Sequence, residues 1–449
     1  MKKVVIIGGG ITGLSAAFWA SKRGHDVLLL EASEHLGGNI RAHNDASFPF
    51  EQGPNTILDN RPLTQEFLTE LELDADVVEA ADVAQERMVY LNGALRKVAP
   101  SPLKLLKTLG LFGFLRMAIE PFIPRGRPEK ETVAEFFDRR IGSTARKRLV
   151  DAFIGGIYAG DSTALSMQAC FPRVLGAIQN HGSLFKALRA LKTNKRARTI
   201  SFNGGMVRWP STVAEKLPQG TVKTGVKATS IVKTEAGYEV EVNDGTSTTQ
   251  VMCKSVVLCV PAPQAAALLE NVWSDHGIRA LKEIPYSSVV TMGVSWPAVP
   301  SLRAKVGAFG FLAPRGQGLR ILGSVFSSSI FPKSFPDQTT AVSVFIGGST
   351  DPEACSSSDE TLFEVVKTEL TKVFGASLPL KLHSIRRWLE GIPQLTMGHH
   401  ERIEQIRKSE KETPGVLLAG NYLEGVSLHD AIASGKRAVD ALDAPRQQP

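Results

Sequence analysis

The sequence predicts an α/β protein with three parts: a parallel sheet covered by helices, a second region with a mixed sheet, and a helical region. Three observations predict this arrangement. The chain opens with a β-branched run, Lys2–Ile7, which is followed by a glycine-rich turn and a helical stretch, Ile11–Arg23. Short runs of strand composition recur between residues 289 and 346. A strongly apolar stretch, Ser101–Pro124, lies between these two parts.

The glycine-rich turn has the spacing of a dinucleotide-binding site. Gly8, Gly10 and Gly13 form G-x-G-x-x-G between the first strand and the first helix. These glycines permit a tight turn, close approach to a pyrophosphate and close packing of helix on strand. A second strand, Asp26–Leu30, ends at Glu31, which is placed to accept hydrogen bonds from ribose hydroxyls. The pattern predicts a Rossmann-type domain rather than an accidental glycine-rich turn.

Further helices and strands follow from local patterns. Leu63–Leu71 has helical character, and Thr132–Arg140 begins with a Thr-x-x-Glu capping box. Met88–Val98 reads as a hairpin, because Asn92-Gly93 favours a type I′ turn. Ser183–Arg198 is basic and mostly helical, and a final helix ends near Leu442. Other strands are predicted at Thr221–Val232 (two strands), Tyr238–Val242, Ser255–Val260, Val289–Trp296, Gly310–Ala313, Leu322–Val325, Ala341–Ile346 and Val416–Leu418.

Composition narrows the functional classes. Lysine and arginine exceed aspartate and glutamate by 52 − 45 = 7, which favours anionic partners. The sequence contains no nucleic-acid-binding module, and no uninterrupted apolar run reaches the roughly 20 residues that span a bilayer. Four scattered cysteines show no metal-ligand spacing, so we expect a reducing compartment and no metal site. These are Cys170, Cys253, Cys259 and Cys355.

Two further segments indicate which dinucleotide binds. Gly37-Gly38 follows Glu31, and this extension resembles the second glycine pair of the flavin-dependent amine oxidase superfamily; a flexible turn is the alternative. Phe50–Asn55 (FEQGPN) resembles the segment beside the flavin in one branch of that superfamily, the protoporphyrinogen oxidases. Ser201–Leu217 resembles the F-x-G-G-M segment of the superfamily. The implied cofactor is FAD.

Motifs in the rest of the chain resemble the protoporphyrinogen oxidase family in register. Ile154–Pro172 matches its G-x-Y-A-G-D-x-x-x-L-S-M-x-A-x-F-P stretch, and Leu322–Pro332 matches L-G-x-x-x-x-S-x-x-F-P. Arg386–His399 resembles W-x-x-x-I-P-Q-Y-x-x-G-H, with Leu395 in place of the usual tyrosine. Gly420–Leu428 resembles G-N-Y-x-x-G-V-x-L. The resemblance covers nearly the whole chain.

The resemblance implies a set of FAD contacts along the chain. The backbone near Val226 usually contacts the adenine, and the C-terminal glycine-rich helix start suits the diphosphate and the flavin. The implied FAD-binding residues are Gly8, Gly10, Ile11, Thr12, Gly13, Glu31, Ala32, Gly37, Gly38, Gly53, Pro54, Asn55, Val226, Gly420, Asn421, Val426 and Ser427.

The same resemblance implies five substrate residues. Arg96, in G-A-L-R-K-V-A-P, corresponds to an arginine thought to hold a substrate propionate, although an alanine precedes the proline here. Gly160 would approach the macrocycle through its backbone, Leu312 and Phe331 would form apolar walls, and Asn55 would polarise the reacting edge. From pattern alone, the alternatives are a solvated arginine, a helix-linking turn and ordinary core packing.

The implied activity is FAD-dependent oxidation of protoporphyrinogen IX in three hydride-transfer stages, with molecular oxygen as acceptor and hydrogen peroxide as product. A tetrapyrrole is the implied substrate, and the resemblance is compatible with a homodimer. Three alternatives stay open: coproporphyrinogen III oxidation, which would need more basic pocket residues; amine oxidation; and a non-catalytic porphyrin carrier. Ile284–Val294 lacks the lysine, and Gly420–Leu428 lacks the cysteine, that many amine oxidases carry.

The apolar stretch Ser101–Pro124 carries Lys104, Lys107 and Arg116. We expect interfacial helices on a membrane surface, with ordinary subdomain helices as the alternative. The expected location is cytoplasmic with peripheral membrane association. The expected domains are an FAD-binding domain from 1–85, 200–265 and 383–449, a substrate-binding domain from 86–98 and 266–382, and a helical, membrane-associated subdomain over 99–199.

Overall fold

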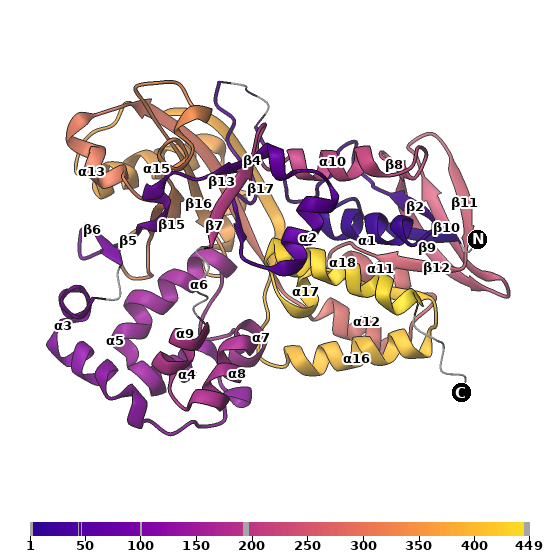
Figure 1. Ribbon diagram of the computed structural model, residues 1–449, viewed down its shortest axis with the longest axis horizontal. Helices are drawn as coiled ribbons and strands as arrows, with labels where there is room; N and C mark the ends of the chain where they lie inside the picture. Colours follow the sequence, from indigo (N-terminus) through magenta and orange to yellow (C-terminus); the bar gives the residue numbers. More distant parts are fainter. Residues whose placement is uncertain (1–2, 44, 46, 99–100, 192–196, 444–449) are drawn as a thin grey trace.

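The computed structural model describes residues 3–43, 45, 47–98, 101–191 and 197–443. It forms a parallel-sheet region, a mixed-sheet region and a helical region, which Figure 1 shows arranged around a common centre. Three predicted segments extend beyond the described residues. These are Lys2 of the first strand, Ala99 and Pro100 of the arginine motif, and residues 192–196 of the basic stretch.

The parallel-sheet region confirms the predicted N-terminal architecture. Its five parallel strands have the order β18-β12-β1-β2-β8. The central strand β1 is buried from Val4 to Ile7, as its continuous apolar run predicted. The strands are β1 (Lys3–Ile7), β2 (Asp26–Leu30), β8 (Val222–Lys223), β12 (Ser255–Leu258) and β18 (Val416–Leu418).

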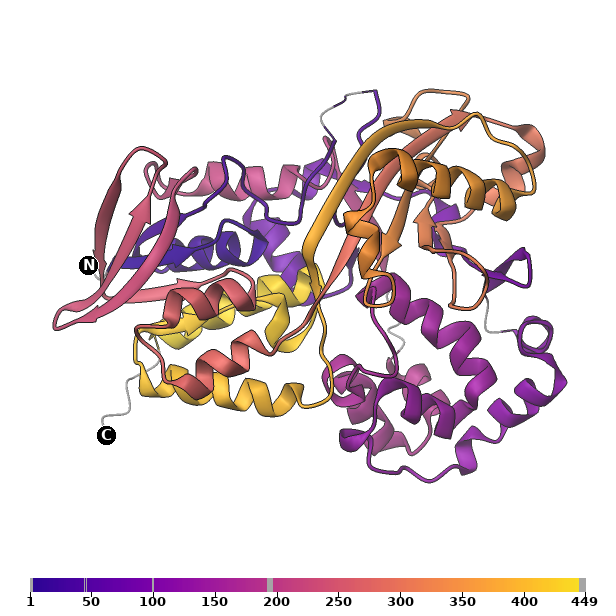
Figure 2. The same ribbon diagram turned by 180° about the vertical axis from the view of Figure 1, so that it is seen from behind.

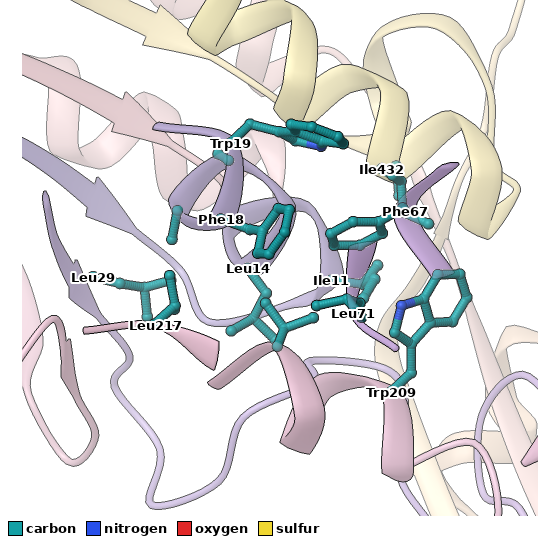
Figure 3. Packing of buried hydrophobic residues seen from close by; sticks show 14 of the residues in the cluster. Ile11, Leu14, Phe18, Trp19, Leu29, Phe67, Leu71, Trp209, Leu217 and Ile432 are labelled. Carbon is teal, nitrogen blue, oxygen red and sulfur yellow. The ribbon is translucent and has the colours of Figure 1, made fainter. Parts of the chain in front are cut away.

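Helix α1 is the centre of a large apolar core on one face of this sheet. Figure 3 shows Phe18 and Trp19 of α1 packed with Phe67 and Trp209. A Cβ on Gly435 of α18 would lie 2.3 Å from the Thr12 carbonyl oxygen, so the two helices pack closely there. The helices on this face are α1 (Ile11–Lys22), α2 (Pro62–Glu70), α10 (Arg208–Lys216) and α18 (Leu428–Asp443).

The opposite face of the parallel sheet is covered by a second core, in which β-sheet and helices both take part. The antiparallel strands β9, β10 and β11 extend to one end of the molecule (Figure 2). A small sheet of order β3-β7-β4 lies near α2. The elements are β9 (Lys227–Thr234), β10 (Gly237–Asn243), β11 (Thr248–Cys253), α11 (Ala262–Leu269), α12 (Asp275–Lys282), α16 (His399–Glu412), α17 (Asn421–Glu424), β3 (Ile57–Asp59), β7 (Arg198–Phe202) and β4 (Val77–Glu79).

The mixed-sheet region has seven strands in the order β17-β13-β16-β15-β14-β5-β6. Only the β14–β5 pair is parallel in the described sheet. Helix α15 covers one face. The elements are β5 (Arg87–Leu91), β6 (Ala94–Val98), β13 (Tyr286–Pro297), α13 (Arg303–Val306), β14 (Gly310–Leu312), β15 (Ile321–Val325), α14 (Ser327–Ile330), β16 (Thr339–Gly347), α15 (Asp359–Phe374) and β17 (Lys381–Pro393).

Strand β17 differs from the sequence prediction. The expected boundary at residue 383 falls inside this 13-residue strand, which pairs with β13 from Ser295 to Tyr286. Residues 383–393 therefore belong to the mixed sheet rather than to the parallel-sheet region. Charged residues at Arg386, Arg387 and Glu390 interrupt the alternation that would have predicted a strand.

The helical region lies below the mixed sheet in Figure 1. The predicted capping box is present, because Thr132 and Glu135 exchange hydrogen bonds at the start of α4. Glu120 and Arg140 form a fully buried ion pair. Among the described residues, no helix combines the length and apolar character needed to cross a bilayer. The helices are α3 (Pro102–Ala118), α4 (Val133–Ile141), α5 (Ser143–Ala145), α6 (Asp151–Tyr158), α7 (Met167–Cys170), α8 (Pro172–His181) and α9 (Leu184–Leu191).

Candidate active site

The first glycine turn has the close contacts that its spacing predicted. Gly8 has φ +109°, and a Cβ there would lie 2.6 Å from the Cys259 carbonyl oxygen. A Cβ on Gly13 would lie only 1.9 Å from the Gly8 carbonyl oxygen. No side chain fits at either position, since backbone atoms occupy the space. The strand, the turn and α1 therefore pack as a nucleotide-binding unit requires.

The N-terminus of α1 is open to an anion. Gly10 is the N-cap and provides no side-chain hydrogen bond, so the first N–H groups of the helix, from Ile11 onward, lack an intrahelical acceptor. Thr12 is buried below them. A Cβ on Gly10 would meet nothing nearer than the Gly38 Cα at 3.8 Å. The free N–H groups and the helix dipole can together hold a diphosphate.

Glu31 lies beside this turn, at the end of β2. Its Oε2 accepts a hydrogen bond from the Gly9 N–H at 2.6 Å, and its Oε1 accepts from the Ser33 N–H and hydroxyl at 2.9 and 2.8 Å. The Glu31 carbonyl accepts from the Val226 N–H at 2.9 Å. Glu31 and Val226 are thus neighbours, as a ribose contact and an adenine contact must be. The adjacent Ala32 is exposed.

The second glycine pair packs against the first turn instead of forming a free loop. The Gly37 N–H donates to the Gly9 carbonyl at 2.8 Å. Gly38 has φ +60°, and a Cβ there would lie 3.0 Å from the Gly10 Cα. This contact lies at Gly10, the N-cap of α1. The pair is therefore part of the candidate diphosphate site.

The Gly53–Asn55 segment is held between the parallel and mixed sheets. A Cβ on Gly53 would lie 1.8 Å from the Asn39 carbonyl oxygen, and the Asn55 side-chain amide donates to the Gly53 carbonyl at 3.0 Å. The Trp388 indole N–H of β17 donates to the Gln52 carbonyl at 2.7 Å. Pro54 lies half-buried between them. The segment that would pass beside the flavin is therefore fixed to the sheet that would bind substrate.

Glu51 is a buried acid that the sequence analysis did not select. Its Oε1 accepts from the Met206 N–H at 2.7 Å, and its Oε2 is buried without a hydrogen-bond partner. Burial raises the pKa of Glu51 to about 8. The Glu51 carboxyl group also packs closely against the F-x-G-G-M turn, since a Cβ on Gly205 would lie 2.6 Å from its Oε1. Its position two residues before Gly53 was the available indication.

The C-terminal motif lies on the predicted cofactor side of the site. The Gly420 N–H donates to the Ser434 hydroxyl at 3.0 Å, where α17 begins at Asn421. Ser427 precedes α18, and its hydroxyl donates to Asp430 at 2.6 Å. Val426 packs against the apolar core of the helical region. The motif therefore links the cofactor side with the helical region.

Two of the predicted substrate residues lie on one face of the mixed sheet. Arg96 and Leu312 both pair with Val89, from opposite sides, and directly paired residues point to the same face. Val89 and Leu312 pack with Ala152 of α6. The other face, which includes Met88, packs under α15. Arg96 and Leu312 therefore face the helical region, in one row across three strands.

The Arg96 side chain suits the binding of a carboxylate. The side chain is half-buried, and its Nε is buried without a hydrogen-bond partner. Among the described residues, no carboxylate forms an ion pair with Arg96. A buried guanidinium nitrogen without an acceptor is costly, and a carboxylate would satisfy it.

Gly160 lies at the far end of α6, beyond the contact of that helix with Leu312. A Cβ on Gly156 would lie 2.5 Å from the Leu312 Cδ2, so the helix and the strand pack tightly. Phe331 follows α14 at the open end of the β14–β15 hairpin, whereas Leu312 is at its loop end. The two predicted apolar walls thus lie at different ends of one hairpin, and their joint role stays a prediction.

Comparison with known proteins identifies the family. The model for flavin containing amine oxidoreductases matches residues 11–443. The chain belongs to this family. It is 33% identical to protoporphyrinogen oxidase 1 of Arabidopsis thaliana, over 94% of this chain and 84% of that protein. It is 27% identical to coproporphyrinogen III oxidase of Bacillus subtilis (strain 168), over 98% of each chain.

Solved structures agree on the fold of this flavin-containing oxidoreductase. One is a crystal structure from Exiguobacterium sp. 255-15 that carries the provisional name protoporphyrinogen oxidase. It has a TM-score of 0.85 at 24% identity and covers 98% of each chain. Reduced UDP-galactopyranose mutase has a TM-score of 0.74 at 17% identity, covering 99% of this chain and 95% of that one. At these identities the likeness shows the fold alone.

Family membership and the dinucleotide-binding turn together identify the cofactor as FAD, and the protein is an oxidoreductase. The motif resemblance to protoporphyrinogen oxidases is confirmed by the named relatives. The residues present fit FAD, because the start of α1 lacks a side-chain cap and backbone atoms lie against the Cβ positions of Gly8 and Gly13. The individual FAD contacts stay predictions.

Proposed function

We propose that this flavoprotein oxidises a porphyrinogen to a porphyrin, with protoporphyrinogen IX as substrate and molecular oxygen as the final acceptor. The observation that carries the proposal is the row of Arg96, Val89 and Leu312 on the face opposite α15. An unpaired guanidinium beside an apolar wall suits a flat macrocycle with propionate groups. The name of the Arabidopsis thaliana relative, protoporphyrinogen oxidase 1, supports the same substrate class.

Each residue has a limited task in this proposal. Arg96 binds a propionate, Leu312 and Phe331 contact the macrocycle, and the backbone at Gly160 limits its position. Asn55, whose amide is held by the Gly53 carbonyl, polarises the reacting edge. FAD, when bound, supplies the electron-accepting ring. The protein orients the substrate and keeps water from the reacting carbons.

Anaerobic bleaching of the flavin tests the proposal. The yellow protein is mixed separately with protoporphyrinogen IX, coproporphyrinogen III and a set of amines, and porphyrin fluorescence is followed after air is admitted. We expect rapid bleaching by protoporphyrinogen and fluorescence in air. Arg96→Ala should raise KM at least tenfold, since a charge-assisted hydrogen bond contributes about 1.5–3 kcal/mol. Bleaching by amines alone, or by none of the compounds, contradicts the proposal.

Coproporphyrinogen III is a second candidate substrate, because the Bacillus subtilis relative with that name covers 98% of both chains. It carries additional carboxylates. Burial lowers the pKa of Arg61, and the charge of Arg173 lowers it further. Arg61, at the N-cap of α2, and Arg173, in α8, are therefore neighbours. The charge of Asp430 opposes this decrease, and neither arginine forms an ion pair within the described part of the chain. If coproporphyrinogen is preferred, Arg61→Ala should reduce its kcat/KM more than that of protoporphyrinogen.

We also propose that the helical region rests on a membrane surface. Phe112 and Phe122 are each 86% exposed, and Leu103 and Leu111 are exposed by 62% and 59%. Lys104 and Lys107 lie on the same helix. Large apolar side chains with basic neighbours favour insertion among lipid headgroups. Flotation with vesicles containing anionic lipid tests this proposal, and failure to float at low salt would contradict it.

A further inference from the structure

Two family motifs that are far apart in sequence form one seam. The Ser166 N–H donates to the Leu395 carbonyl at 2.8 Å, and the Met397 N–H donates to the Ala164 carbonyl at 3.0 Å. Leu395 is fully buried in the core of the helical region. The residues after β17 thus join the segment that follows α6, which includes Gly160.

Gln394, at the start of this seam, has a side chain with hydrogen bonds on both ends. It is 4% exposed. Its amide nitrogen lies 2.8 Å from the Tyr158 carbonyl, 3.1 Å from the Ser287 hydroxyl and 3.0 Å from the Ile392 carbonyl. Its oxygen accepts from the Ser349 hydroxyl at 3.1 Å. The two backbone carbonyls can only accept, so they fix the orientation of the amide.

The backbone that Gln394 holds is unusual. Ala159 ends α6 with φ 45°, a left-handed conformation that costs a non-glycine residue about 1–2 kcal/mol. The Ala159 carbonyl accepts from the Ser349 N–H at 2.7 Å, and the Gly160 carbonyl accepts from the Arg315 guanidinium at 3.1 Å. A Cβ on Gly160 would lie 2.6 Å from the Gln394 Oε1. Contacts from the mixed-sheet region therefore maintain this conformation.

A cavity of about 300 Å³ lies next to the Tyr158–Gly160 segment. The position of this segment therefore depends more strongly on its hydrogen bonds. The lining of the cavity includes Asp161, Ser287, Ser349, Gln394 and Thr396. Close-packed atoms normally resist displacement of a buried backbone. Here part of that packing is missing, so the side chain of Gln394 takes over the support.

We propose that Gln394 is a positioning residue, which holds the Tyr158–Gly160 backbone as a wall of the porphyrinogen site. The proposal depends on the proposed function, because Gly160 is the predicted contact with the macrocycle. Gln394 does not touch FAD or the reacting carbons in this proposal. It acts through the backbone and determines how closely the wall approaches the substrate.

Two substitutions separate the hydrogen bonds from the volume of the side chain. Gln394→Met keeps the length and removes every hydrogen bond, whereas Gln394→Glu, when ionised, keeps the acceptor towards Ser349 and has no donor for the Tyr158 carbonyl. We expect each to raise KM for the porphyrinogen about tenfold, because each loses the buried hydrogen bond to the Tyr158 carbonyl. We expect kcat at saturation and the FAD content to stay within about threefold of wild type. Gln250→Met, on exposed β11, is the matched control.

If Gln394→Met has the same KM as Gln250→Met and only a lower melting temperature, the proposal is overturned. Gln394 is then a purely structural residue. If Gln394→Met does not fold, Ser349→Ala provides a milder test, since it removes only the contact to Oε1. We expect a smaller increase in KM, about threefold, and an unchanged KM overturns the proposal here too. Failure of the proposed function is distinguishable, because wild-type protein would then not be bleached by any porphyrinogen.

Discussion

Helices α1 and α3 are both strongly apolar, but their surroundings are opposite. In α1, all residues from Ile11 to Ala20 are buried between the parallel sheet, α2, α10 and α18. In α3, only Leu109 and Met117 are buried, and a residue with non-helical φ and ψ, Gly110, kinks the helix. Leu105 and Phe114 are partly buried against the core of the helical region, whereas Leu103, Leu111, Phe112 and Leu115 are exposed. Apolar composition therefore does not by itself indicate a place in the core.

The difference between the two helices separates two uses of apolar surface. Side chains around α1 contribute to the free energy of folding, because they leave water when the chain folds. Exposed side chains of α3 contribute nothing comparable until another apolar phase covers them. Substitutions in α1 should accordingly change stability and cofactor binding, and substitutions of the exposed side chains of α3 should change membrane binding alone.

The largest expected effect is that of Gly13→Ala in α1. The added Cβ would lie 1.9 Å from the Gly8 carbonyl oxygen, and that oxygen belongs to a backbone that cannot move without opening the turn. We expect loss of bound FAD and destabilisation by about 3 kcal/mol or more. Flavin absorbance of the purified protein and urea unfolding measure the two effects.

Gly176→Ala, in α8, is the matched control for this prediction. No atom lies within 4 Å of the position of its Cβ. Alanine should be neutral or should stabilise by about 0.5–1 kcal/mol, because it lowers the entropy of the unfolded chain. Equal FAD content in both variants would show that the G-x-G-x-x-G turn tolerates a side chain, against our account of the site.

A phenylalanine pair compares the two helices directly. Phe18 of α1 is 9% exposed, whereas Phe112 of α3 is 86% exposed. Phe18→Ala should destabilise the protein by about 3–5 kcal/mol, since it leaves a cavity between Trp19 and Phe67. Urea unfolding measures this loss. A change below 1 kcal/mol would mean that the core around α1 repacks freely.

Acid should lower the stability of the protein through His399, at the start of α16. Its Nε2 lies 3.3 Å from the Leu423 carbonyl, and burial lowers the pKa of His399 to about 4. The unfolded chain binds a proton near pH 6.5, before the folded protein does, so stability falls as the pH is lowered from about 6.5 to 4.

The variant His399→Gln isolates this contribution. Its stability relative to wild type should rise by about 2–3 kcal/mol between pH 6.5 and 4, since glutamine does not titrate. Urea unfolding at a series of pH values gives the difference. A difference independent of pH would contradict a neutral, buried His399.

The smallest expected effect on stability is that of Phe112→Ala. We expect a change within about 0.5 kcal/mol, because the side chain is already exposed. Binding to anionic vesicles should nevertheless weaken about tenfold, since a phenylalanine transferred from water contributes about 1.5–3 kcal/mol. Equal vesicle binding by the variant and wild type would remove α3 from the proposed membrane surface.

Local patterns predicted most elements of the parallel-sheet region within one or two residues. β2 and β18 have the predicted bounds, and the type I′ turn has positive φ at Asn92 and Gly93. These features are encoded by neighbouring residues: apolar runs, glycine spacing and turn residues. The two motifs around Gly8 and Gly37 could be placed together because their backbone contact follows from a known spacing.

Features that depend on distant contacts could not be predicted in this way. β17 forms because β13 offers it a partner, although its own sequence is interrupted by charges. The roles of Gln394 and Glu51 come from buried contacts with Tyr158 and Met206, which are more than 150 residues away in the sequence. Apart from their places in the motifs Phe50–Asn55 and Arg386–His399, no local pattern distinguishes these side chains from ordinary polar residues of a loop.

The packing of α1 against α18 determines when the protein can bind its cofactor during synthesis. The Ser15 hydroxyl donates to the Ile432 carbonyl, 417 residues later. A nascent chain that ends before residue 416 lacks both β18 and α18, so one edge of the parallel sheet and one side of α1 are exposed. We therefore expect FAD capture to wait until nearly the whole chain has left the ribosome, and we expect chaperones to bind the apolar N-terminal helix until then.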